Sequence, residues 1–342
     1  MGLKDKYNVA VVGATGLVGE TILDILEERE FPVGNLVPLA SNRSLGKTVH
    51  YCESEYPVVD LETFDFTDID IAFFSAGANV SRVYAVKAAS QGAVVIDNTS
   101  EFRMQDDIPL IVPECNLQDL DRYKLRNIIA NPNCSTIQML VALKPLHDAF
   151  DIERINVATY QATSGAGRSF MQSLETGTKD MLSGSVIDKG EGEHPIPFNV
   201  IPKIDVLQPN GYTKEEMKIV LETKKVLNSD TINVNPTCVR VPVFFGHSEA
   251  VHIETFKEPN IDEVIQILSD APGILVVNGK EPGDYPSAVY DAAGRDEVFV
   301  GRIRKDISTK NGLNLWVVSD NIRKGAALNS IQIGECLIEQ YL

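Results

Sequence analysis

Residues 7–29 read YNVAVVGATGLVGETILDILEER, and this stretch decides the fold of the first part of the chain. It opens with the β-rich run Tyr7–Val12, continues through a glycine-rich turn and ends with the apolar spacing of a helix. Gly13, Gly16 and Gly19 permit a tight turn and a close approach of the backbone to a phosphate group. The stretch predicts a strand, a turn and a helix whose free N–H groups face an anion; the spacing GxxGxxG leaves an ordinary strand-to-helix turn open as the alternative.

The alternation of strand and helix continues to about residue 131. Apolar strands are predicted at residues 36–40, 71–75, 93–97 and 127–130, with a helix at residues 80–91. This order is typical of a parallel sheet covered by helices. The fold class is therefore predicted to be α/β, with a Rossmann-like doubly wound N-terminal domain.

A different pattern begins after residue 131. An apolar helix is predicted at residues 135–147, and long alternating strands follow at residues 152–161, 237–243 and 248–256, which together indicate an α+β domain. Residues 184–211 are rich in Gly, Pro and charge but also contain apolar side chains, so we expect an ordered loop region. Residues 325–341 have helical periodicity, and we expect this helix to pack back on the first domain.

Composition excludes several classes of protein. A chain of 342 residues with 44% hydrophobic content buries a large core, so it is neither disordered nor fibrous. The net charge is −17 and the cations are dispersed, which argues against a nucleic-acid partner. We expect no membrane partner and a cytoplasmic location, because the sequence has no run of eighteen apolar residues and no apolar leader. The five cysteines include no CxxC pair, so we expect neither a metal site nor a disulfide framework.

The segment after the second predicted strand bears on the choice of cofactor. An NAD enzyme commonly has an acidic residue here that binds the ribose 2′-hydroxyl, but this chain has Arg43 and Ser44 instead. A cation and a hydroxyl suit a 2′-phosphate, which indicates NADP. The alternative is that Arg43 is an ordinary solvated loop residue.

A candidate nucleophile lies in the motif NPNCST, residues 131–136. Cys134 stands where the sheet domain ends and a helix begins, and the dipole at a helix N-terminus favours the thiolate. The alternative is a buried structural cysteine. A thiol nucleophile needs a proton partner, and among the five histidines we favour His247, because it follows a strand and a glycine.

Further polar residues interrupt apolar elements. Arg240 is flanked by valines in a predicted strand and needs an anionic partner if it points inward; an outward side chain is the alternative. Arg103 follows the carboxyl end of a strand, where open α/β sheets bind ligands. Glu215 and Lys218 share a face of a predicted helix, although a solvated charge pair is the favoured interpretation of either residue taken alone. Gln161 ends a strand, beside a position for a substrate carbonyl.

Several of these motifs together resemble the aspartate-semialdehyde dehydrogenase family. The resemblance rests on GATGLVG (13–19), PNCST (132–136), TYQATSGAG (159–167), RVPVFFGHSE (240–249) and DNIRKGAA (320–327), and it covers nearly the whole chain. It implies an NADP-binding domain formed by residues 1–131 and 322–342, with residues 132–321 forming a catalytic and dimerisation domain. The family also implies a homodimer.

The resemblance assigns a role to each matching residue. Cys134 corresponds to the acyl-accepting nucleophile, His247 to the general acid/base and Gln161 to the residue that orients the substrate. The expected binding residues are Arg240 for the substrate carboxylate, Glu215 for its amino group, with Glu216 as the alternative, and Arg103, Asn133 and Lys218 for phosphate. Glu101, beside Arg103, is a departure from the family pattern. The expected cofactor residues are Gly13, Thr15, Gly16, Leu17, Val18, Arg43, Ser44, Ser164, Gly165 and Asn321.

The implied reaction is the NADPH-dependent reductive dephosphorylation of L-aspartyl 4-phosphate to aspartate 4-semialdehyde, through a thioester on Cys134. It belongs to the biosynthesis of lysine (through diaminopimelate), threonine, methionine and isoleucine. One alternative is an N-acetyl-γ-glutamyl-phosphate reductase, in which we expect a glycine, not Asn133, before the cysteine. A second alternative is a non-catalytic NADP-sensing protein, which has no reason to keep Cys134, Gln161, Arg240 and His247 together.

Overall fold

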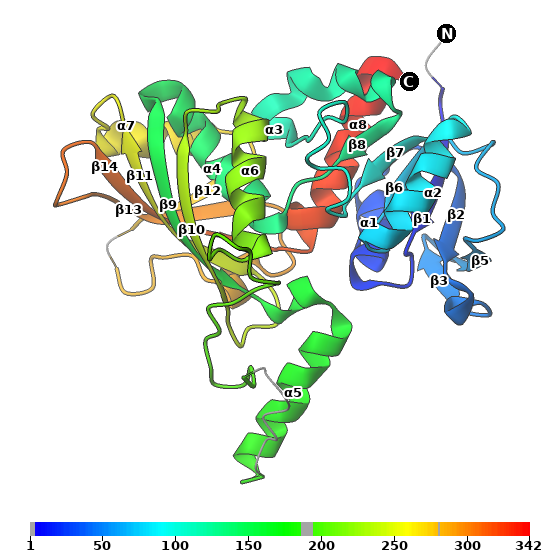
Figure 1. Ribbon diagram of the computed structural model, residues 1–342, viewed down its shortest axis with the longest axis horizontal. Helices are drawn as coiled ribbons and strands as arrows, with labels where there is room; N and C mark the ends of the chain where they lie inside the picture. Colours follow the sequence, from blue (N-terminus) through cyan, green and yellow to red (C-terminus); the bar gives the residue numbers. More distant parts are fainter. Residues whose placement is uncertain (1–3, 186–193, 280) are drawn as a thin grey trace. The chain divides into compact units, whose positions relative to one another are not determined.

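The computed structural model describes residues 4–185, 194–279 and 281–342. These form two compact units, one of residues 1–133 with 325–342 and the other of residues 134–324. Each unit is built around its own sheet (Figure 1). None of the helices in the described part of the chain is both long and apolar enough to cross a bilayer.

The first unit contains a parallel sheet of six strands in the order β5-β2-β1-β6-β7-β8. The strands are β1 (Tyr7–Val12), β2 (Val33–Ala40), β5 (Val59–Asp60), β6 (Ile71–Phe74), β7 (Val94–Asp97) and β8 (Ile128–Ala130), with a separate hairpin of β3 (Thr48–Tyr51) and β4 (Ser54–Pro57). The order reverses between β1 and β6, which is the switch point where sheets of this kind bind ligands.

Helices cover both faces of this sheet. They are α1 (Leu17–Glu28), α2 (Ala78–Ser90), α3 (Pro113–Asn116) and α8 (Leu328–Tyr341), with 3₁₀ turns at η1 (Asn42–Ser44) and η2 (Leu117–Leu125). Val9, Val11 and Phe73 pack with α1 and α8 in one core, while the alternate residues Ala10 and Phe74 are buried on the opposite face. Burial on both faces explains why these strands are almost wholly apolar.

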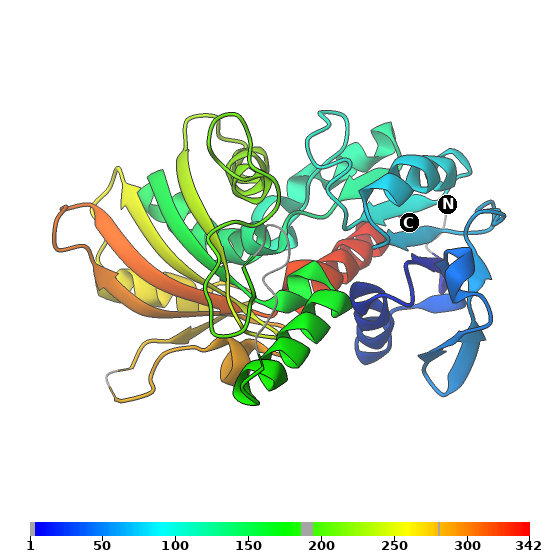
Figure 2. The same ribbon diagram turned by 60° about the horizontal axis from the view of Figure 1, so that its bottom comes forward.

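The second unit is built on a mixed sheet of six strands in the order β10-β9-β11-β14-β13-β12. The strands are β9 (Ile152–Gln161), β10 (Asn233–Arg240), β11 (His247–Thr255), β12 (Ile274–Val277), β13 (Val298–Lys305) and β14 (Gly312–Ser319), and Figure 2 shows them side by side. The central strand β11 is antiparallel to both of its neighbours, β9 and β14, and β14 is antiparallel to β13, while the pairs β10–β9 and β12–β13 at the two ends are parallel.

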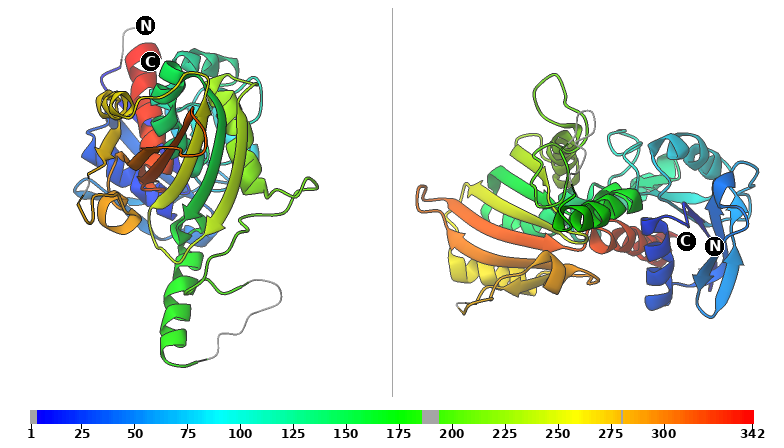
Figure 3. Two further views of the ribbon diagram at one scale, coloured as in Figure 1. Left: turned by 90° about the vertical axis from the view of Figure 1, so that its left-hand side faces the viewer. Right: turned by 90° about the horizontal axis from the view of Figure 1, so that it is seen from below.

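Three helices of the second unit, α4 (Cys134–Phe150), α6 (Lys214–Leu227) and α7 (Ile261–Asp270), pack on this sheet and on one another. The odd-numbered residues of β11 point into this packing and are buried, whereas most even-numbered residues on the other face are half-buried. The helix α5 (Arg168–Leu182) extends away from the strands (Figure 3). Short turns complete the unit at η3 (Thr163–Ala166) and η4 (Ala288–Ala292), and η5 (Arg323–Ala327) lies at the junction with α8.

The structure confirms the predicted fold class: a parallel doubly wound domain and a second domain with a mixed sheet and helices. The bounds of β1 and β9 are those predicted, and the predicted C-terminal helix joins the core of the first unit. In the loop predicted at residues 184–211, residues 186–193 lie outside the described part. Of its apolar residues, Ile196 is buried, but Phe198 is exposed.

Candidate active site

Cys134 is the first residue of α4, and its thiol is partly exposed. The preceding strand β8 ends at Ala130, so the cysteine follows a three-residue connection from the parallel sheet. Because the helix begins at the cysteine itself, the free N–H groups of the first turn surround the thiol and favour its anionic form. Cys115 and Cys238 are buried, and burial raises the pKa of the Cys238 thiol.

His247 is the first residue of β11 and is fully buried. Its Nδ1 accepts a hydrogen bond from the backbone N–H of Ala162, with an N···N distance of 3.0 Å. Burial and the charge of Arg240 hold the pKa of His247 well below its ordinary value, although a backbone hydrogen bond at Gly246 opposes them. The neutral ring therefore carries its proton on Nε2, which has no partner among the described residues and is available as a donor.

Gly165 lies beside this nitrogen. A Cβ atom at Gly165 would lie 3.3 Å from His247 Nε2 and 3.3 Å from Arg240 Nη1. The predicted pair of His247 and Arg240 thus meets at one glycine, where a side chain would crowd both donors.

Gln161, at the end of β9, is linked to the start of α4 and to α6. Its Nε2 donates to Ser135 Oγ at 3.0 Å and to Glu215 Oε1 at 3.4 Å. Glu215 also accepts from Lys218 Nζ at 2.8 Å, and Lys218 lies 3.3 Å from Asp205. The structure therefore brings Gln161, Glu215 and Lys218 into one network beside the residue that follows Cys134.

The adjacent Glu216 has a different environment. Its Oε2 accepts from the backbone N–H of Thr213 at 2.7 Å in a capping box that begins α6, and its Oε1 accepts from the backbone N–H of Cys238 at 3.0 Å. Both oxygens hold local structure, which leaves Glu215 as the glutamate that faces Gln161.

Arg240 ends β10 and is buried, so the outward-facing alternative is wrong. Its Nη1 donates to the carbonyl of Ala162 at 2.6 Å. Burial lowers the pKa of Arg240, and the charges of Cys134, Glu215 and Cys238 oppose this effect. Arg240 also lines a pocket of about 490 Å³ in the second unit, together with Phe170, Lys203 and Asp205 among others.

The glycine turn has the geometry predicted for it. Gly13 has a φ of +90°, and a Cβ there would lie 3.1 Å from the backbone N of Ala76, so glycine is required. A Cβ at Gly19 would lie 2.1 Å from Gly13 O, so the helix packs directly on the turn. Thr15 Oγ1 lies 3.2 Å from Ser44 Oγ, which brings the segment after β2 to the turn.

The other residues expected to bind the cofactor divide between the units. Gly16 caps α1, Leu17 and Val18 form its first turn, and Arg43 is exposed on η1. Ser164 and Asn321 lie in the second unit, where Asn321 Nδ2 is 3.0 Å from Ser164 Oγ and Asn321 Oδ1 accepts from the backbone N–H of Gly246 at 3.0 Å.

Arg103 is buried at the carboxyl edge of the parallel sheet. Its Nε donates to the carbonyl of Asn131, and its Nη2 donates to the carbonyl of Asn98, both at 2.8 Å. The nearby Glu101 accepts two hydrogen bonds of 2.8 Å from Arg82, so its charge already has a partner. Asn133 is buried in the same unit, while Lys218 belongs to the other.

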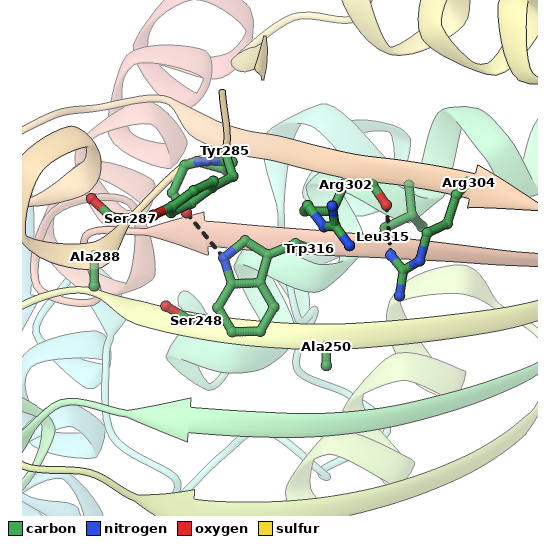
Figure 4. Close-up of a pocket in the computed structure, with 10 residues that line it drawn as sticks. Ser248, Ala250, Tyr285, Ser287, Ala288, Arg302, Arg304, Leu315 and Trp316 are labelled. Atoms are coloured by element: carbon green, nitrogen blue, oxygen red, sulfur yellow. Dashed lines mark hydrogen bonds between the residues drawn. The ribbon is translucent and has the colours of Figure 1, made fainter. Parts of the chain in front are cut away.

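A second pocket, of about 550 Å³, lies on the face of the mixed sheet opposite α4. Figure 4 shows Ser248, Ala250 and Trp316 on its strands, with Arg302 and Arg304 on β13. Trp316 Nε1 donates to the carbonyl of Pro286 at 3.0 Å. The described residues contain no group of three or more His, Cys, Asp or Glu side chains placed to hold a metal.

Some residues around the site could not be predicted from the sequence. Ala162 holds His247 with its N–H and Arg240 with its carbonyl, and backbone groups leave no signal in a sequence. Phe170 lies 5.8 Å from the Arg240 guanidinium, on a helix that was not predicted. Glu249 was considered only as part of the motif RVPVFFGHSE, although an acidic residue in a predicted strand is a visible signal.

Two family models match the chain. One, described as "Semialdehyde dehydrogenase, NAD binding domain", matches residues 8–123, and the other, "Semialdehyde dehydrogenase, dimerisation domain", matches residues 143–324. Among curated relatives, the aspartate-semialdehyde dehydrogenase of Shewanella sp. (strain DB6705) is 54% identical over 99% of this chain and 100% of the relative. That of Legionella pneumophila is 55% identical over 98% of this chain and 96% of its own.

Solved structures agree with these relatives. Aspartate semialdehyde dehydrogenase II from Vibrio cholerae superposes with a TM-score of 0.96 at 53% identity, covering 98% of this chain and 100% of its own. The same enzyme complexed with ASA gives a TM-score of 0.96 at 52% identity, with coverage of 99% and 100%. The aspartate semialdehyde dehydrogenase with NADP from Candida albicans gives a TM-score of 0.75 at 25% identity, with coverage of 97% and 98%.

Proposed function

Because the chain belongs to the aspartate-semialdehyde dehydrogenase family, we propose that it reduces L-aspartyl 4-phosphate to aspartate 4-semialdehyde with NADPH, in the biosynthesis of lysine, threonine, methionine and isoleucine. The observation that carries the proposal is the cysteine at the start of α4, with Gln161, Arg240 and His247 in the same unit. A glycine is absent before the cysteine, where Asn133 stands, which disfavours the N-acetyl-γ-glutamyl-phosphate reductase alternative.

Cys134 supplies the nucleophile. Its thiolate attacks the acyl carbon, the bond to the phosphate oxygen breaks, phosphate leaves and a thioester remains on the sulfur. After reduction, the thiohemiacetal collapses, and the aldehyde departs as the thiolate re-forms. The free N–H groups at the start of α4 stabilise negative charge both on the sulfur and on the substrate oxygen.

His247 handles the proton at Nε2. Because Nδ1 accepts a hydrogen bond from Ala162, the neutral ring is a donor toward the open side near Gly165. We propose that this N–H first stabilises the developing substrate oxyanion and that the acid/base role follows from it. A neutral imidazole is a suitable donor here, since burial and Arg240 disfavour the charged ring.

Two sites separate the two anionic groups of the substrate. Arg240, at the end of a rigid strand, presents its guanidinium to the substrate carboxylate, and Glu215 binds the amino group beside Gln161. Arg103, Asn133 and Lys218 bind phosphate. The bond between Glu101 and Arg82 supports this assignment, because it leaves less negative charge directed at Arg103.

The glycine turn fits a dinucleotide, because Gly13 and Gly19 let the turn and α1 pack closely, which leaves the free N–H groups at the start of α1 for a pyrophosphate. Arg43 and Ser44 are proposed to bind the 2′-phosphate, with Thr15, Gly16, Leu17 and Val18 at the turn and Ser164, Gly165 and Asn321 at the nicotinamide end. Bound NADPH supplies the hydride that reduces the thioester.

The test is an assay of NADP⁺ reduction by purified protein with aspartate semialdehyde and phosphate. We expect turnover that requires both substrates and disappears in Cys134→Ser. N-acetylglutamate semialdehyde as the preferred substrate would establish the reductase alternative. NADP binding without turnover on either aldehyde would establish the sensing alternative.

We propose that the active form is a homodimer, consistent with the dimerisation-domain match. The half-buried face of the mixed sheet around Ala250 and Trp316 is the surface we assign to the second copy (Figure 4). Ala250→Arg places a charge on this face and should convert the dimer to a monomer in light scattering. A dimer of unchanged stability would contradict the assignment.

A further inference from the structure

The strand that carries His247 also carries a buried carboxyl group for which the proposed reaction has no use. Glu249 lies two residues after His247, so both side chains point from β11 toward α4. Glu249 is 0% exposed, and neither of its carboxyl oxygens has a hydrogen-bond partner of standard geometry among the described residues, although the side chains of Ser135 and Gln138 lie close to it. An unpaired buried carboxylate is costly, so a role is expected for it.

The surroundings of Glu249 are polar. Thr159 on β9 and Val317 on β14 lie opposite it in register. On α4, Ser135 and Gln138 lie close enough to lower its pKa, but burial is the larger effect and raises that pKa well above the ordinary value.

The titratable and charged groups of this region are His247 on the same strand, Cys134 at the start of α4, Cys238 and Arg240 on β10, and the pair Glu215 and Glu216 on α6. Glu215 and Glu216 both raise the pKa of Cys238, so they are further acidic groups near this strand. Burial raises the pKa of Glu249 well above its ordinary value and therefore favours the neutral carboxyl.

We propose that Glu249 is a positioning residue, which ties the first turns of α4, behind Cys134, to the strand that carries His247. Gln138 Nε2 lies 3.4 Å from the carbonyl of His247, and its Oε1 is a buried acceptor without a partner among the described residues. A neutral carboxyl has an O–H that donates to such an acceptor, while its carbonyl oxygen accepts from Ser135 or Gln138.

These hydrogen bonds connect the elements that carry Cys134 and His247, whose positions must be held for the reaction. Ser135 follows the nucleophile and accepts from Gln161 at 3.0 Å, and Gln138 contacts the backbone of His247. Both Ser135 and Gln138 interact with Glu249, so its carboxyl links the nucleophile's helix to the histidine's strand. Small displacements of this kind reduce the rate of a reaction more than they reduce substrate affinity.

The inference rests on the proposed function, and two variants test it in the full-length protein. Glu249→Gln keeps the shape and both kinds of hydrogen-bonding atom, so we expect kcat within about twofold of wild type. Glu249→Leu keeps the volume but loses the hydrogen bonds, so kcat should fall by about 10- to 100-fold, with KM for the semialdehyde changed by less than about threefold. Thr223→Val is the matched control, because Thr223 is another fully buried side chain with an unpartnered hydroxyl, on α6, and kcat should be unchanged.

Two further measurements do not depend on activity. The infrared carbonyl band of a protonated carboxyl should appear in wild type at neutral pH and be missing from Glu249→Gln. Because the folded protein keeps a proton that the unfolded chain releases above its ordinary pKa, wild type should lose stability relative to Glu249→Gln as pH rises from about 5. Its relative unfolding constant should rise by up to about tenfold per pH unit over the range between the unfolded and folded pKa values.

The outcomes separate this inference from the proposed function. Wild-type kcat in Glu249→Leu overturns the inference while leaving the function intact, whereas full activity in Cys134→Ser overturns the function. An equal loss of kcat in Glu249→Gln and Glu249→Leu, or an unchanged infrared band in Glu249→Gln, shows that a charged Glu249 is used and also overturns the inference. If Glu249→Leu fails to fold, the infrared and stability comparisons of wild type with Glu249→Gln test the inference in its place.

Discussion

Replacing Arg240 by leucine tests whether the substrate carboxylate and phosphate bind to separate cationic residues. The guanidinium is buried, and one of its N–H groups is already bound to the carbonyl of Ala162 at 2.6 Å. If the remaining donors bind the substrate carboxylate through two charge-assisted hydrogen bonds, each contributes about 1.5–3 kcal/mol. The sum, about 3–6 kcal/mol, corresponds to a loss of about 10²- to 10⁴-fold in kcat/KM for the semialdehyde.

Part of this loss should be in kcat. Arg240 holds the carbonyl of Ala162, and the N–H of the same residue holds His247, so the variant loosens the histidine as well. Arg240→Lys keeps the charge but not the planar fork, and we expect an intermediate loss. Lys203→Met is the control, because Lys203 is an exposed cation that lines the same pocket; kcat/KM should change by less than about threefold.

The assay is steady-state reduction of NADP⁺, with the semialdehyde and phosphate varied in turn. We expect KM for phosphate to stay within about threefold of wild type in Arg240→Leu, because the division of sites assigns phosphate to Arg103. A rise in the phosphate KM as large as that in the semialdehyde KM would refute the division. So would a loss in Lys203→Met equal to that in Arg240→Leu, because general cationic charge in the pocket would then suffice.

Four further outcomes are expected. Arg103→Leu should raise the phosphate KM by about 10- to 100-fold while the semialdehyde KM changes little, and equal effects on both would contradict the assignment. Cys134→Ser should bind NADP and fold normally but lose at least about 10³-fold in kcat, and a labelled acyl group retained on any other cysteine would sink the assignment. Arg43→Ala should raise KM for NADP about tenfold or more and leave KM for NAD almost unchanged; equal effects would show that Arg43 does not bind the 2′-phosphate. Because the pKa of His247 is depressed, its unfolded form binds a proton below about pH 6.5 that the folded form does not. Stability should therefore fall as pH drops below that value, and His247→Gln should lose this part of the dependence in thermal denaturation.

The parallel sheet could be predicted from sequence because burial on both faces makes its strands apolar. The strand β1 and the turn at Gly13 carry a local signal that needs no tertiary context. The mixed sheet was predicted only in part. In β13 the sequence VFVGRIRK contains a glycine and two arginines, and Arg302 has a φ of +52° at an irregularity in the strand pairing, so its alternation is interrupted.

At the candidate site too, some features could be predicted from the local sequence, whereas others depend on the tertiary fold. The choice between Glu215 and Glu216 could be made from the local sequence, since Thr213 and Glu216 have the spacing of a capping box, which assigns Glu216 to the start of the helix. The tautomer of His247 could not be predicted from the local sequence, because it depends on the backbone N–H of Ala162, which lies 85 positions away in sequence. The residue types at the candidate site could be read from the sequence, whereas the hydrogen bonds that orient their side chains depend on strand pairing.

The two backbone contacts of Ala162 have a consequence for mutagenesis. An alanine scan of the site passes over position 162, since the residue is already alanine, although it holds both Arg240 and His247. Ala162 has a φ of −67°, which is the value of a proline ring. Ala162→Pro therefore deletes the N–H that fixes the imidazole and keeps the carbonyl that fixes the guanidinium. A single substitution thus frees the ring to change tautomer and becomes a chemical probe of which nitrogen carries the proton.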